Sequence, residues 1–316
     1  MVESLKENYG DDLRVIYRHF PLKSIHDKAQ ITAEAAEAAG AQGKFWEMHD
    51  ILFEKQQQWS SQPVEKMVDI LTGYAEEIGV PDADRFRQEL ENGTYTAQID
   101  QAYQAALDAG LNGTPSFAVN GVMFPSQAFG LSYQGLDIFI KLMKLRDRWY
   151  SQPEQVIQPD KQYIATIQTE KGDIVIELFA DTAPVNVNSF VFLAQQGWYR
   201  GVTFHRVLPG FVAQGGDPTG TGVGFPGYRC GDEITPEHTF DQPGMVSLAN
   251  SGPNTNGSQF FITYDAVPQL NANFTIIGRV IEGMDVAESL TPRDPQQTPD
   301  APPGDKIIDI QIEVKE

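Results

Sequence analysis

The segments FHRVLPGFVAQGGD, at residues 204–217, and LANSGPNTNGSQFFIT, at residues 248–263, decide the fold of the C-terminal half of this chain. Both join short apolar runs to loops rich in glycine, proline or asparagine, a pattern typical of short strands between long connections. Upstream, YIATIQTEKGDIVIELF at 163–179 alternates apolar and polar residues around a Lys-Gly-Asp turn, which predicts a β-hairpin. A helix is predicted over 184–196 and a last strand over 307–314. The pattern as a whole favours a closed β-barrel with few helices.

The two segments, in this order and at this spacing, resemble the signature segments of cyclophilin-type peptidyl-prolyl cis/trans isomerases. The similarity extends through TAPVNVNSFVFLAQQGWYRGVTFHR and IIGRVIEGMDV, so it covers nearly all of residues 162–316. It implies a mainly-β, closed eight-stranded antiparallel barrel with two helices. It also implies isomerase activity on unfolded or extended proline-containing polypeptides, with no cofactor and no metal.

The chemistry of this reaction explains which side chains matter. An X-Pro amide resists rotation because the proline nitrogen shares its lone pair with the carbonyl group. A catalyst must therefore prefer the twisted amide, and one fixed donor aimed at that nitrogen suffices. Arginine stays charged and presents several donors in a rigid fork, and Arg206 is the matching position. The rotation transfers no proton, so we interpret the adjacent His205 as a packing residue.

The resemblance assigns catalytic roles to Arg206, Phe211 and Gln214. It implies an apolar slot for the proline ring, and a polar groove for the residues before the proline that includes the backbone at 249–251. The substrate-binding positions implied are Val212, Gly220, Ala249, Asn250, Ser251, Gln259, Phe261, Gln269, Leu270 and Phe274.

Three of these positions depart from the family pattern. Gln269 stands where many members carry tryptophan, Phe274 where histidine or tyrosine is usual, and Val212 where methionine is common. The loss of the tryptophan should weaken cyclosporin-like ligands more than catalysis. Phe274 keeps an aromatic wall but gives up a polar group.

The N-terminal half reads mainly as helix. LRVIY at 13–17 predicts a strand, and an Ala-rich segment from Asp27 to about Gln57 predicts a helix with Asp27 as its N-cap. In PSFAVNGVMF at 115–124, the Asn120-Gly121 pair predicts a β-hairpin. Further helices are expected over 64–78, 83–90, 96–109 and 133–148.

AGAQGKFWEMHDILF at 39–53, with VIYRHFPL before it and GTPSFAVNGV after it, resembles the DsbA-like branch of thioredoxin-fold proteins. The resemblance implies an α/β fold with a helical insertion and a cis peptide bond at Thr114-Pro115, a pair that could otherwise be a turn before a strand. The strand and CxxC-bearing helix that open this family are not in the sequence, which we interpret as a truncated or mis-started reading frame. Because Cys230 is the only cysteine, the domain as written is redox-inactive.

Composition sets the remaining expectations. A linker over 149–161, containing SQPEQVIQPD, divides a thioredoxin-like domain at 1–148 from an isomerase domain at 162–316. A net charge of -20 argues against nucleic-acid and anionic membrane partners. The sequence holds no membrane-spanning run, and its start has no signal-peptide pattern, so the chain as written is expected in the cytoplasm. A lost upstream signal or anchor would instead place the protein in the cell envelope or outside the cytoplasm.

Two other functions remain alternatives. One is a non-catalytic chaperone or scaffold that binds proline-containing segments; Gln269 and Phe274 favour it, whereas Arg206, Phe211, Gln214 and Phe261 oppose it. The other is a disulfide oxidoreductase, which would need a CxxC pair that this sequence lacks.

Overall fold

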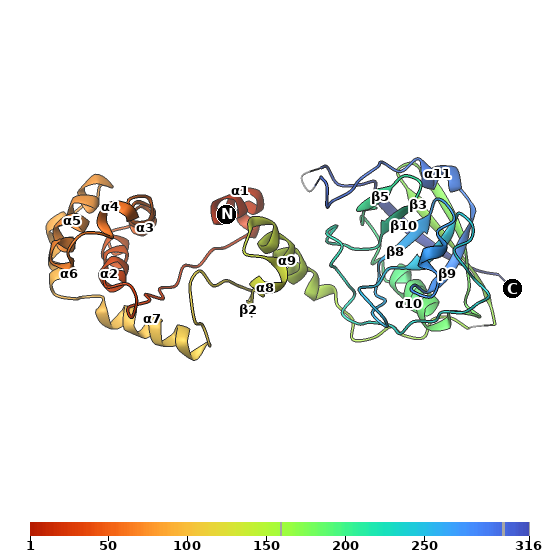
Figure 1. The fold of residues 1–316 in the computed structure, drawn as a ribbon, viewed down its shortest axis with the longest axis horizontal. Helices are drawn as coiled ribbons and strands as arrows, with labels where there is room; N and C mark the ends of the chain where they lie inside the picture. The colour runs from red at the N-terminus through yellow and green to blue at the C-terminus, as the bar shows by residue number, and fades with distance from the viewer. Residues whose placement is uncertain (159, 299–300, 316) are drawn as a thin grey trace. The chain divides into compact units, whose positions relative to one another are not determined.

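The structure is a computed structural model that describes residues 1–158, 160–298 and 301–315 (Figure 1). The chain divides into two compact units, one of residues 1–124 and one that starts at residue 125. Within the described residues, no helix combines the length and apolar character needed to cross a membrane.

The N-terminal unit is mainly helical. Its core joins the apolar faces of four helices, and Met48, Leu71 and Phe86 are fully buried there. The elements are α1 (Val2–Tyr9), α2 (Ala29–Gly40), α3 (Phe45–Glu54), α4 (Gln56–Trp59), α5 (Met67–Glu77), α6 (Ala83–Glu91), α7 (Thr96–Asp108), β1 (Ala118–Val119), β2 (Val122–Met123) and two short 3-10 turns, Gly10–Asp12 and Val64–Lys66.

Three sequence expectations for this unit are wrong. The single helix expected from Asp27 is three helices, because the chain turns between α2 and α3, where Gly43 has a φ of 78°. Asp27 is not the N-cap; Lys28 holds that position, and the Asp27 carboxylate accepts instead from Lys28 Nζ at 2.8 Å. Residues 13–17 form no strand, because no described segment pairs with them, and Ile16 is 60% exposed.

The predicted hairpin at Asn120-Gly121 is confirmed. Ala118 pairs with Met123, and both turn residues have positive φ, as a two-residue hairpin turn requires. This hairpin is the only sheet among the described residues of the unit, so the α/β expectation gives way to a mainly helical fold.

The C-terminal unit is built on one antiparallel sheet in the order β10-β3-β4-β9-β7-β8-β6-β5. The predicted hairpin is confirmed as β3 and β4, with Thr169 opposite Gly172, and the predicted helix and last strand are α10 and β10. The strands are β3 (Gln162–Thr169), β4 (Gly172–Leu178), β5 (Arg206–Leu208), β6 (Val212–Gly215), β7 (Met245–Leu248), β8 (Phe260–Thr263), β9 (Ile276–Glu282) and β10 (Ile307–Lys315). The helices are α8 (Ser126–Phe129), α9 (Tyr133–Leu145), α10 (Pro184–Gln195), α11 (Met284–Glu288) and the 3-10 turns Arg146–Arg148 and Pro268–Leu270.

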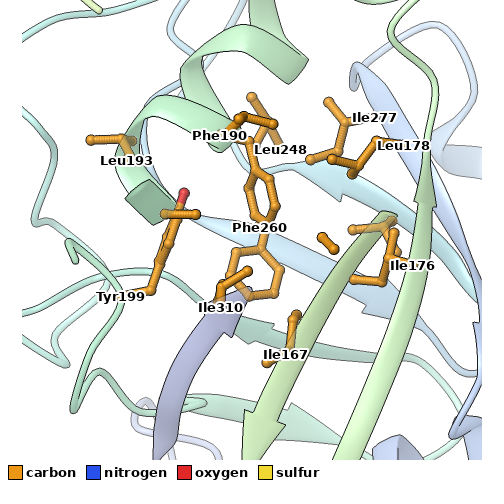
Figure 2. Close-up of a cluster of buried hydrophobic side chains, with 14 of the residues drawn as sticks. Ile167, Ile176, Leu178, Phe190, Leu193, Tyr199, Leu248, Phe260, Ile277 and Ile310 are labelled. Atoms are coloured by element: carbon orange, nitrogen blue, oxygen red, sulfur yellow. The ribbon is translucent and has the colours of Figure 1, made fainter. Parts of the chain in front are cut away.

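The main core lies between the concave face of this sheet and α10. Phe260 of β8 is fully buried and meets Phe190 of α10 edge-on at 5.6 Å between ring centroids. Figure 2 shows these two rings among aliphatic side chains from five strands, including Ile167, Ile176, Leu248, Ile277 and Ile310.

The expected eight-stranded antiparallel barrel is confirmed in part, because the sheet is a half-barrel. No ladder joins β10 to β5 among the described residues. The reason is that β5 has only three residues, and the segment before it, 201–204, takes up the contact instead. Phe204 donates from its backbone N–H to Asp305 O at 2.9 Å, and Ile307 donates to Val202 O at 2.8 Å. One isolated bridge, between Thr203 and Lys306, therefore lies in the gap that a longer strand would close.

Candidate active site

Three of the sequence-predicted residues form a row across neighbouring strands. Arg206 of β5 lies opposite Gln214 of β6, which in turn lies opposite Phe261 of β8. Directly opposed residues in antiparallel strands have side chains on the same face, with Cβ atoms about 5 Å apart. The strand register thus brings a cation, an amide and an aromatic ring together.

The Arg206 side chain is partly exposed, and its Cζ lies 5.9 Å from the ring centroid of Phe211. No described carboxylate forms an ion pair with it, and no described group accepts a hydrogen bond from it. Its N–H donors therefore remain available to a bound peptide.

The neighbouring His205 faces the interior, where it is only 2% exposed. Burial lowers the pKa of the His205 imidazole, although the nearby Asp217 carboxylate opposes the shift. The imidazole is therefore neutral near pH 7, which keeps a second positive charge away from Arg206.

An apolar cluster of side chains lies beside this row. Val212 and Phe261 are buried in one hydrophobic cluster, and the partly buried Phe211, Ala249, Leu270 and Phe274 pack against it. Phe274 meets Phe261 edge-on at 5.4 Å between ring centroids.

The sequence did not predict one aromatic residue of this cluster, Phe240. Phe240 is fully buried and stacks on Phe261, with their ring centroids 5.9 Å apart. It follows a loop of polar residues, and no local pattern marks it as a neighbour of Phe261.

Two side-chain amides next to this cluster hold each other in fixed orientations. Gln259 Nε2 donates to Gly222 O at 2.9 Å and to Gly224 O at 3.0 Å. The Gln259 amide oxygen therefore points the other way, and it accepts from Gln214 Nε2 at 3.0 Å. Because the Gln214 amide nitrogen is engaged in this way, its oxygen remains as an acceptor for a peptide.

The loop that supplies those carbonyl groups is organised by Asp217, a second residue that sequence reasoning missed. Its fully buried carboxylate accepts from the backbone N–H groups of Thr219 at 2.7 Å, Thr221 at 3.1 Å and Gly222 at 2.6 Å. Gly220, which was expected near the groove, lies in this loop with a φ of 66°. The only sequence signal for Asp217 is its place at the end of the first quoted segment.

The remaining predicted positions lie around the edges. Ala249 donates from its backbone N–H to Gln259 O at 2.8 Å, and Asn250 Nδ2 donates to Asn273 O at 3.0 Å. Ser251 and Gln269 are exposed. In the N-terminal unit, the peptide bond between Thr114 and Pro115 is cis, and both residues are exposed.

Within the part of the chain that the structure describes, the half-barrel carries an arginine without an ion-pair partner next to an aromatic cluster, and comparison with known proteins gives the family. The sequence model described as "Cyclophilin type peptidyl-prolyl cis-trans isomerase/CLD" matches residues 164–312. Peptidyl-prolyl cis-trans isomerase A of Mycobacterium tuberculosis is 50% identical over 133 residues, which cover 37% of this chain and 73% of the relative. An Arabidopsis thaliana peptidyl-prolyl cis-trans isomerase is 48% identical over 126 residues, covering 39% of this chain and 79% of the relative. The chain belongs to the cyclophilin family, and its C-terminal half is a peptidyl-prolyl cis-trans isomerase domain.

Among solved structures, a cyclophilin-type isomerase from Cryptosporidium parvum matches with a TM-score of 0.45 and 40% identity, over 49% of this chain and 99% of that one. For the N-terminal half, a thioredoxin family model matches residues 1–140. That half is a thioredoxin-like domain.

Proposed function

We propose that the isomerase domain acts on X-Pro bonds of extended protein clients and so accelerates their folding. The observation that carries the proposal is the guanidinium of Arg206, which has no ion-pair partner among the described residues and whose strand register puts it in one row with Gln214 and Phe261. The proline ring would occupy the slot formed by Phe211, Val212 and Phe261. Slow X-Pro isomerisation limits the folding of many chains, so a catalyst of this step has an evident use.

In this mechanism, Arg206 donates a hydrogen bond to the proline nitrogen as the amide twists. The donor is preorganised because the Phe211 ring lies near the guanidinium, and the low-dielectric slot next to it strengthens the interaction. One donor of this kind contributes about 3 to 4 kcal/mol, which corresponds to about two to three orders of magnitude in rate.

The other site residues keep the rotation confined to one bond. The Gln214 oxygen and the backbone at Ala249 and Asn250 would hold the residues that precede the proline, while the slot holds the ring. Fixing both sides of the bond removes the competing motions that a free peptide would make.

The thioredoxin-like domain would act as a client-binding or supporting domain rather than as a redox enzyme. The only cysteine in the sequence, Cys230, lies in the isomerase domain and is buried. Dithiol exchange needs a pair of cysteines, so the chain as written cannot perform it within one molecule.

The test is the cis-to-trans rate of a short Xaa-Pro peptide with the full chain, comparing wild type with Arg206→Ala. Arg279→Ala is a matched control, because Arg279 is an exposed arginine of β9 that pairs with Glu177. We expect wild-type catalysis to fall at least tenfold in Arg206→Ala and to persist in the control.

Equal activity of Arg206→Ala and wild type would contradict the assigned role of Arg206. Peptide binding by the wild type without acceleration would instead support the scaffold alternative.

A further inference from the structure

The segment between the α9 region and β3 is packed onto the isomerase fold. Residues 149–157, here called the strap, form no helix or strand, yet Ile157 is buried in the main core and the Tyr150 ring meets Phe192 at 5.0 Å. The buried Asn188 holds the far end of the strap: its Oδ1 accepts from Val156 N at 2.8 Å, and its Nδ2 donates to Glu154 O at 2.9 Å. The strap, which the sequence marked only as a linker, is thus an ordered part of this unit.

The near end of the strap clamps the loop that follows Gly224. The ring centroids of Trp149 and Phe225 are 4.8 Å apart, and Tyr150 N donates to Pro226 O at 2.8 Å. The two backbones approach so closely that a Cβ on Gly227 would lie 2.5 Å from Tyr150 O and 2.7 Å from Trp149 Cβ. Gly227 also has a φ of 98°, so only glycine fits there without strain.

The other side of the same loop meets the active site. Gly224, next to Phe225 in the chain, supplies one of the two carbonyl groups that accept from Gln259 Nε2. Gln259 in turn accepts from Gln214, the residue opposite Arg206. Direct contacts therefore connect Trp149 to Gln214 through Phe225, Gly224 and Gln259.

We propose that Trp149 is a positioning residue of the isomerase site, acting through the loop at 224–227 on the amides of Gln259 and Gln214. Without the indole ring, Phe225 keeps the Arg229 guanidinium, 4.2 Å from its ring centroid, but loses its contact with the strap, so Gly224 O can move away from Gln259. The Gln214 amide then loses its fixed orientation, and the peptide is held less well for rotation. The inference rests on the proposed function, because that function gives Gln214 its contact with the client.

The strap also joins the isomerase domain to the preceding part of the chain. Arg148, directly before Trp149, donates to Trp198 O at 3.1 Å, so the connection is fixed up to the last residue before the strap. The strap, which links the isomerase domain covalently to the preceding residues, thus also contains Trp149, the residue proposed to position the active site.

The experiment measures kcat and KM for an Xaa-Pro peptide with the full chain carrying Trp149→Ala, Trp149→Phe or Ile157→Val. Ile157→Val is the matched control, because it perturbs the far end of the strap, away from Phe225. We expect Trp149→Ala to lower kcat/KM by about three- to tenfold, Trp149→Phe to restore most of the loss, and Ile157→Val to leave it within about twofold.

A double-mutant cycle with Gln259→Ala separates positioning from general destabilisation. If Trp149 acts through Gln259, the double variant should lose little more kcat/KM than Gln259→Ala alone. Fully multiplicative losses, or an unchanged kcat/KM in a Trp149→Ala protein with a lowered Tm, would overturn the proposal. An inactive wild type would refute the proposed function itself. A wild type that is active, with the same kcat/KM in Trp149→Ala, would refute only the role of Trp149.

Discussion

Replacing Asp217 by asparagine keeps the size of the side chain and changes only its charge and acceptors. The buried carboxylate accepts from three backbone N–H groups, and an amide oxygen can take the place of only one of its two oxygens. In the better orientation, the oxygen keeps the bonds from Thr221 and Gly222, while the new NH₂ group faces the N–H of Thr219. The partly buried N–H of Thr219 is then left without this acceptor, and the remaining bonds lose their charge assistance.

The expected loss of stability in Asp217→Asn follows from the unsatisfied donor and from the lost charge. A buried unsatisfied donor costs about 1 to 3 kcal/mol, and hydrogen bonds to a charged group are worth about twice those to a neutral one. We therefore expect Asp217→Asn to lower the free energy of unfolding of the isomerase domain by about 2 to 3 kcal/mol. For a domain of this size, this corresponds to a Tm lower by about 4 to 12 °C.

Calorimetry of the full chain, together with the Xaa-Pro rate, measures both consequences. Asp241→Asn is the control, because Asp241 is exposed and, within the described residues, accepts from side chains alone, Thr239 Oγ1 at 2.7 Å and Asn271 Nδ2 at 3.4 Å. We expect the control to stay within about 0.5 kcal/mol of wild type. A loss in Asp217→Asn no larger than in the control would refute the role given to Asp217.

Two further predictions concern titratable groups. Burial raises the pKa of the Cys230 thiol, so we expect a thiol reagent to modify the folded protein far more slowly than the unfolded one; equal rates would show that Cys230 is accessible in the native state. Burial lowers the pKa of His205, so between about pH 6.5 and the lowered pKa the unfolded chain binds a proton that the folded chain does not. The free energy of unfolding therefore decreases as the pH is lowered through that range. Urea unfolding across this range should show a smaller fall in His205→Gln, and an unchanged pH dependence would rule out this contribution.

The two hairpins and the helix α10 could be predicted because each depends on residues close together in the sequence. The turn at Asn120-Gly121 needs positive φ, which asparagine and glycine supply, and Gly172, the first residue after the turn between β3 and β4, also has positive φ, so both hairpins could be predicted from short segments. The predicted helix over 184–196 is confirmed as α10, and Pro184 stands in its first turn, where proline is well tolerated.

Features that depend on distant partners could not be predicted in the same way. Residues 13–17 have strand-like composition, but a strand exists only where another backbone pairs with it. Phe240, Asp217 and Trp149 reach the site region through packing between segments far apart in the sequence, which no local period reveals. The length of β5, which leaves the barrel half-open, also depends on which neighbouring segment takes its hydrogen bonds.

The pairing of β3 with β10 has a consequence for how the protein is made. The two strands are neighbours in the sheet but stand at opposite ends of the isomerase sequence, from Tyr163 opposite Val314 to Thr169 opposite Ile307. At a synthesis rate of about 5 to 20 residues per second, β3 waits on the order of ten seconds on the ribosome for its partner to be translated. During that time the β3 edge is open to other chains, whereas the helices of the N-terminal unit find their partners earlier. The isomerase sheet is therefore completed late in synthesis, because the hairpin of β3 and β4 is translated long before β10.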